Sequence, residues 1–226
     1  LLDYLPAVVA AIGISLLGYI ADGLNTEFYK QNARSQVTVE LGVVRANLEG
    51  VVSTNVQLVR GLAGLVSVEP DISQEKFERL AAQLIAEKSQ IRLVSTAPDL
   101  VVRHVYPRAG NEAAIGLDLR SDPERYEAAI RARDLNKVVV AGPIELVLGG
   151  QALIARVPVF TGGDSTGGTN QFWGLISSVL DVDLVYGAAG MLDENLPIEI
   201  AIRGRDCSGP QGGIFFGTPK LFSDSP

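Results

Sequence analysis

The feature that most constrains this chain is an uncharged apolar segment that runs directly into a long heptad repeat. Residues 4–21 contain no charged side chain. As a helix they reach about 27 Å, which is enough to cross the hydrocarbon core of a bilayer. We expect a transmembrane helix at 1–21 rather than a cleaved signal peptide, because no basic leader is visible and no clear cleavage site precedes Asp22. The segment therefore predicts attachment to a membrane.

Apolar residues then recur at alternating steps of four and three from Val37 to Leu65. This 3.5-residue period is typical of a coiled-coil seam, because it keeps one side of a left-handed supercoil apolar. Asn55 is the single polar member, and a buried amide at such a position specifies register and dimer state. We predict a stalk helix over 22–69. It would pair with its own copy through Leu41, Val44, Leu48, Val51, Asn55, Leu58 and Leu62.

The same helix also has a second apolar line, which allows packing on the chain's own globular part. Its members lie beside the seam, so one line can contact the domain while the other contacts a partner. Both arrangements stay open from the sequence. The second line consists of Val43, Val52, Val56, Val59 and Val66.

Composition excludes several classes of protein. The net charge of −7 and the pI near 4.8 argue against a nucleic-acid partner, which requires a basic face. One cysteine, Cys207, cannot form an intrachain disulfide. With the single histidine, His104, it cannot supply the usual zinc ligands. We therefore expect no disulfide, metal or nucleotide cofactor.

After the stalk the periodicity changes from helix to sheet, which predicts an α+β unit. Helices are predicted at 73–88 and 121–134, the first with Asp71 and the second with Ser121 as capping residue. Strands are predicted at 91–96, 100–106, 137–148, 151–160 and 171–180. A short helix capped by Asp181 and two short strand fragments follow.

The candidate catalytic residues are isolated. His104 lies on a predicted strand without a Gly-x-Ser-x-Gly elbow, and Cys207 lies in a turn-rich segment. We assign no catalytic residue. Two rival interpretations stay open: a membrane-tethered periplasmic hydrolase that uses His104 or Cys207, and a dimerisation module without a ligand.

Asp118 is the candidate polar anchor of a ligand pocket. It ends a loop and precedes a well-formed helix, where its carboxylate can accept hydrogen bonds from an amine or amide ligand. The alternative is that the carboxylate only caps the loop.

Four segments of this sequence resemble a known family in both order and spacing. They are HVYPRAGNEAAIGLDL, RYEAAIRARD, VVVAGPIELVLGGQALIARVPVF and FWGLISSVLDVDLV, between His104 and Val185. Together they resemble the CHASE domain, an extracytoplasmic sensor domain of bacterial histidine kinases, diguanylate cyclases and plant cytokinin receptors. The resemblance covers roughly residues 68–205.

The resemblance implies a stalk helix that carries two stacked PAS-like antiparallel-sheet subdomains. The membrane-distal one, at 70–182, would bind the ligand, and the membrane-proximal one, at 183–226, would be incomplete. In the plant receptors, positions corresponding to Asp118 and to about Val140 contact the adenine-like ligand. A threonine of those receptors falls near Gly149, which has no hydroxyl, and this argues against cytokinin here. We expect pocket walls from Tyr106, Val140, Gly142, Ala155, Val157 and Ser178.

Taken together, these observations predict the sensor part of a membrane-bound bacterial signalling protein. The domain would lie on the periplasmic or extracellular side of the cell membrane and would not itself be an enzyme. Its expected partners are an unknown small molecule, the membrane and a second copy. Ligand binding would pass through the dimeric stalk to a missing cytoplasmic kinase or cyclase.

Overall fold

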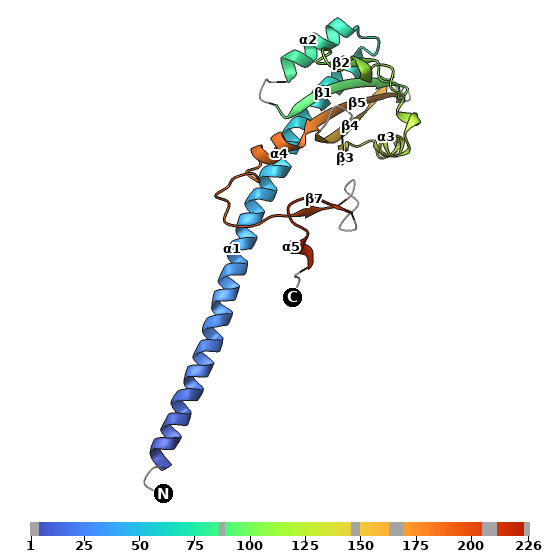
Figure 1. The fold of residues 1–226 in the computed structure, drawn as a ribbon. Helices are drawn as coiled ribbons and strands as arrows, with labels where there is room; N and C mark the ends of the chain where they lie inside the picture. Colours follow the sequence, from blue (N-terminus) through green and yellow to red (C-terminus); the bar gives the residue numbers. More distant parts are fainter. Residues whose placement is uncertain (1–4, 86–88, 146–149, 163–169, 205–211, 224–226) are drawn as a thin grey trace. The chain divides into compact units, whose positions relative to one another are not determined.

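The computed structural model describes residues 5–85, 89–145, 150–162, 170–204 and 212–223. The chain divides into two compact units, Leu1–Val44 and Arg45–Pro226. One uninterrupted helix, α1 (Leu5–Val68), contains most of the first unit and begins the second (Figure 1). The predicted long N-terminal helix is therefore confirmed.

In the first unit, large apolar side chains of α1 are exposed. Leu17 and Tyr19 expose 68% and 80% of their surface. By length and composition alone, the described part of α1 is apolar enough to cross a membrane. Apolar surface of this kind is costly to expose to water.

The second unit is built on a five-stranded antiparallel sheet in the order β2-β1-β5-β4-β3 (Figure 1). All five predicted strands are observed. β2 begins four residues later than predicted, and residues 146–148 of the predicted strand 137–148 lie outside the described residues. The strands are β1 (Ile91–Pro98), β2 (His104–Tyr106), β3 (Val139–Glu145), β4 (Gln151–Thr161) and β5 (Gln171–Asp181).

The helices that flank the sheet begin after caps other than those predicted. Ser73, not Asp71, caps α2 (Gln74–Leu84), because its hydroxyl accepts the Lys76 N–H. Asp122, not Ser121, caps α3 (Pro123–Leu135). In each case the effective cap is the residue with extended backbone directly before the first turn.

One face of the sheet packs against α2 and the last turns of α1. Side chains alternate between faces along a strand, so Val94, Val157 and Ile176 point to this side. They form a buried cluster with Val59 of α1 and Phe77 of α2. We call this side the stalk face. It holds the largest apolar core of the unit.

The opposite face packs against α3 and the two 3₁₀ turns η2 (Glu112–Ala114) and η3 (Leu119–Ser121). The α3 residues that contact it are small, Ala129 and Ala132, so the helix lies close to Leu175 of β5. We call this side the α3 face. Figure 1 shows α2 and α3 on opposite sides of the sheet.

The chain after β5 forms short elements. Asp181 accepts the Leu184 N–H and caps α4 (Val182–Ala188), as predicted. β6 (Ile202–Arg203) and β7 (Ile214–Phe216) make a two-stranded sheet of their own, and α5 (Lys220–Ser223) follows. The predicted subdomain boundaries at 69/70 and 182/183 stay predictions.

Candidate functional site

A cavity of about 340 Å³ opens on the α3 face, between the first turn of α3 and strands β3 and β4. We call it the α3 cavity. Its lining combines charged residues with apolar ones. The lining residues are Asp122, Glu124, Arg125, Ala141, Pro143, Ile144, Ile154 and Arg156.

A bulge in β3 shapes one wall of this cavity. The pairing with β4 shifts register between Ala141 and Ile144. Gly142 has φ +114°, and a Cβ there would come within 2.7 Å of the Ala152 carbonyl oxygen. Only glycine fits such a position, and the displaced strand brings Pro143 and Ile144 to the cavity.

A polar row crosses the sheet through Arg156, which lines the cavity. Arg156 of β4 lies directly opposite Ser177 of β5, which lies opposite Ser95 of β1. Residues opposite one another share a face, so all three point to the α3 side. Arg156 is only 3% exposed. The row therefore presents one guanidinium and two hydroxyls beneath the helix.

An apolar row runs beside the polar row on the same face. Ala141 lies opposite Ile154, and Ile154 lies opposite Val179. Ile154 and Val179 are half-buried, although they belong to central strands. Ala141 and Ile154 both line the cavity. A bound molecule can cover this apolar surface, which α3 leaves partly open.

The acidic residues of the lining lie at its rim. Asp122 accepts the Arg125 N–H at 2.9 Å, and its other carboxylate oxygen lies 3.8 Å from the Arg125 guanidinium. Glu124 is exposed. The rim therefore carries solvated charges of both signs, whereas the guanidinium of Arg156 is buried.

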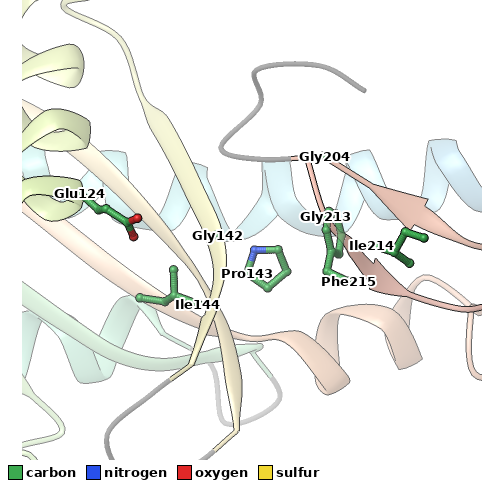
Figure 2. Close-up of a pocket in the computed structure, with 8 residues that line it drawn as sticks. All are labelled: Glu124, Gly142, Pro143, Ile144, Gly204, Gly213, Ile214 and Phe215. Carbon is green, nitrogen blue, oxygen red and sulfur yellow. The ribbon is translucent and has the colours of Figure 1, made fainter. Parts of the chain in front are cut away.

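The β3 bulge also borders a second cavity, of about 290 Å³. Figure 2 shows Glu124 and Ile144 on one side of β3 and the Pro143 ring on the other, toward Phe215. The far wall comes from the two-stranded β6-β7 sheet and its flanks. Its residues are Gly204, Gly213, Ile214 and Phe215.

Asp118 lines neither of these two cavities. Its carboxylate accepts the Arg120 N–H at 2.9 Å and the Arg120 Nε–H at 2.8 Å, which caps η3. These hydrogen bonds from Arg120 hold the pKa of the Asp118 carboxyl below its usual value. The geometry is that of the loop-capping alternative, and ligand binding by Asp118 stays a prediction.

The predicted pocket walls fall mainly on the stalk face. Ala155 and Ser178 lie opposite one another and are fully buried, and Val157 and Tyr106 join the cluster around α1 and α2. Val140 pairs with Ala155 on edge strand β3. Of these six residues, only Gly142 lines one of the two cavities, the one of about 290 Å³. As ligand contacts, these six residues stay predictions.

Sequence reasoning did not select Arg156 or Ile154, which do line the α3 cavity. The sequence does contain a signal for Arg156. Arg156 is the only charged residue in the segment QALIARVPVF, which otherwise reads as a buried central strand. A charge in the interior of such a strand is rarely buried without a purpose.

His104 lies away from the α3 cavity, on edge strand β2. It is buried, with Nδ1 2.9 Å from the Thr96 hydroxyl and its ring 5.9 Å from that of Phe77. Burial, with a smaller effect of Arg103, lowers the pKa of His104. This is the environment of a packed strand residue. Cys207 lies outside the described residues.

In the described ranges, no group of three His, Cys, Asp or Glu side chains could hold a metal ion.

The predicted dimer seam divides into two parts. Asn55 is buried within the second unit, where its Nδ2 donates to Gln90 Oε1 at 2.7 Å, and Leu62 is buried in the stalk-face core. Leu41, in the first unit, is 47% exposed. The Asn55 amide thus has a polar partner, Gln90, in its own chain. Dimerisation through the seam stays a prediction.

Comparison with known proteins agrees with this architecture. Residues 51–216 match the CHASE domain, which is most of the chain. The chain belongs to the CHASE domain family. No curated protein matches the sequence.

Several solved structures share the fold of this CHASE domain. An extracellular ligand binding receptor from Desulfohalobium retbaense is 18% identical, with a TM-score of 0.60 over 80% of this chain and 31% of its own. The sensory domain of the Campylobacter jejuni chemoreceptor Tlp3 with isoleucine bound is 14% identical, with a TM-score of 0.56 over 88% of this chain and 76% of its own. The ligand-binding domain of Tlp3 in complex with L-norvaline is also 14% identical, with a TM-score of 0.52 over 82% of this chain and 69% of its own.

At these identities the likeness concerns the fold, which is that of PAS-like sensory domains. The chain spans 31% of the length of the Desulfohalobium receptor. The family to which residues 51–216 belong is a sensor-domain family.

Proposed function

We propose that this CHASE domain is the extracytoplasmic ligand-sensing part of a membrane-bound bacterial signalling protein, and that its ligand binds in the α3 cavity. The observation that carries the proposal is the cavity itself: about 340 Å³, bounded by a helix and two strands, with an apolar row beside a buried charge. Concave sites with few polar groups on apolar walls are typical of small-molecule binding.

The sheet offers a physical route from this cavity to the stalk. Arg156 points into the cavity from β4, whereas its neighbour Val157 packs on the other face with Val59 and Leu62 of α1. A ligand that shifts β4 therefore changes the packing under the end of α1. We propose that this movement reaches a cytoplasmic kinase or cyclase through paired stalks.

Binding of a small molecule should raise the melting temperature of the full chain in detergent. At a ligand concentration about 100 times Kd, the stabilisation is about 2.7 kcal/mol, which is a shift of several degrees. Amino acids are the first probes, because the Tlp3 domain was solved with isoleucine and with L-norvaline. Purines and sugars follow. If no compound and no metabolite extract shifts the melting curve, the ligand-sensing proposal is wrong.

Cross-linking should show whether the exposed part of the seam contacts a second copy. In a Cys207→Ser background, Leu41→Cys should form disulfide-linked dimers in membranes several times faster than Val39→Cys. Both positions are exposed on α1, at 47% and 62%, so intrinsic access is similar. Only position 41 belongs to the heptad seam, whereas position 39 points away from it. Equal rates at the two positions would contradict a dimer through the seam.

A further inference from the structure

Among the described residues, Arg156 is the only Asp, Glu, Lys or Arg side chain that is buried. Taking a guanidinium out of water is costly, and replacing buried charged groups by apolar residues is often neutral or stabilising. Arg156 lies on a central strand in a row that is otherwise hydroxyl or apolar, and it lines the α3 cavity. Arg156 thus brings a buried positive charge to the wall of the cavity.

We propose that the α3 cavity selects small organic carboxylates, with the carboxylate bound by the guanidinium of Arg156. The proposal rests on the proposed function and names the chemical class of its ligand. Arg presents its N–H donors in a planar fork that fits the two oxygens of a carboxylate. Ser177, directly opposite Arg156 in the sheet, adds a hydroxyl on the same face.

The distribution of charge favours an anion at the inner end of the cavity. Asp122 and Glu124 bring the formal charge of the lining to zero, but both lie at the rim. Their fields are weakened by water and salt, whereas Arg156 acts in a medium of lower dielectric constant. A ligand anion therefore gains most beside Arg156. A neutral or positive group of the ligand is best placed beside the rim acids.

The same charges favour a carboxylate over a phosphate. Arg156 is the one buried cation of the described lining, and two acids, Asp122 and Glu124, belong to the same lining. A phosphate dianion would leave excess negative charge near Asp122 and Glu124. The apolar row formed by Ala141, Ile154 and Val179 lies next to the polar row and suits a short hydrocarbon body. The preferred ligand thus has one carboxylate and an apolar chain.

Matched probe pairs test this preference in the full chain in detergent. The panel consists of the standard amino acids and straight or branched monocarboxylates of four to eight carbons, each paired with its primary amide. Isothermal titration calorimetry should detect carboxylates and give amides at least about tenfold weaker affinity, the cost of a lost charge-assisted hydrogen bond. Equal affinity for an acid and its amide would overturn the proposal, as would binding of amides alone.

Variants assign the preference to a residue. Arg156→Gln should weaken carboxylate binding about tenfold to a hundredfold and remove the preference over the amide, because a neutral side chain replaces the charge. Arg156→Lys keeps the charge without the fork and should retain part of the affinity. Arg92→Gln, an arginine of the same sheet paired with Asp181 at the surface, is the matched control and should bind as wild type.

Two further outcomes separate this inference from the proposed function. If Asp118→Ala abolishes binding while Arg156→Gln does not, the ligand site is at Asp118, and the carboxylate assignment is wrong although sensing stands. If no carboxylate binds but a purine or sugar does, the carboxylate assignment is again wrong, and the proposed sensing function still stands. Folding is checked by the melting curve. Should Arg156→Gln fail to fold, Arg156→Lys must still show a reduced acid-to-amide ratio, and an unchanged ratio counts against the proposal.

Discussion

Gly174→Ala should strongly destabilise the sensor domain. Gly174 lies in β5 with φ +153°, where an added Cβ would come within 2.2 Å of the Ala97 carbonyl oxygen and 2.7 Å of Pro98 Cα. Both atoms belong to the backbone of β1, so no side-chain rotation can relieve the clash, and the β1–β5 pairing must break. We expect a loss on the order of 4 kcal/mol or more, against a total stability of about 5–15 kcal/mol for typical domains.

The measurement is urea unfolding followed by circular dichroism, with Gly190→Ala as the matched control. Gly190 also has a positive φ, +79°, but a Cβ there would meet no atom within 4 Å. This control should lose only about 1–2 kcal/mol from backbone strain. If Gly174→Ala is no less stable than Gly190→Ala, then β1 and β5 do not approach each other as described.

Phe77→Ala should be the most damaging of the side-chain truncations on the stalk face. Phe77 is fully buried and joins α2 to Val59 and Leu62 of α1 and to Ile176 of β5. Truncating a buried phenylalanine costs about 3–5 kcal/mol, because apolar contacts are lost and a cavity remains. The urea concentration at the midpoint of unfolding should fall accordingly.

Two variants of the same helix give the comparison. Phe77→Leu keeps an apolar side chain at the position and should lose much less than Phe77→Ala. Gln83→Ala changes an exposed residue of α2 and should stay within about 0.5 kcal/mol of wild type. Similar losses for Phe77→Ala and Gln83→Ala would mean that α2 does not pack on the sheet.

The proposed ligand site and the packing against α1 lie on opposite faces of the sheet. Arg156 and Ile154 line a cavity on the α3 face, whereas Val157 packs against α1 on the stalk face. Adjacent residues of β4 thus contact the proposed ligand site and the stalk. In the proposed mechanism, the ligand acts on the signal path through strand position, and no separate relay is needed.

The family could be predicted from the sequence because its motifs lie in one continuous order. The strands were found from period-two alternation and the helices from their caps and periodicity, which are local properties. The observed caps still differ from the predicted ones. Ser73 rather than Asp71 caps α2, and Asp122 rather than Ser121 caps α3, because the position at which the backbone becomes extended depends on packing. The apolar segment and the heptads together predicted a long N-terminal helix, which is present as α1.

What only the tertiary structure decided is which face of each element meets which neighbour. Alternation placed Ala155 and Val157 on one face of β4 but could not tell that this face meets α1 and α2, with Arg156 toward α3. Asn55 could be given a buried position but not a partner, which is Gln90, 35 residues later in its own chain. The physical reason is that local sequence determines periodicity, whereas the burial of a face depends on contacts between residues that are distant in sequence.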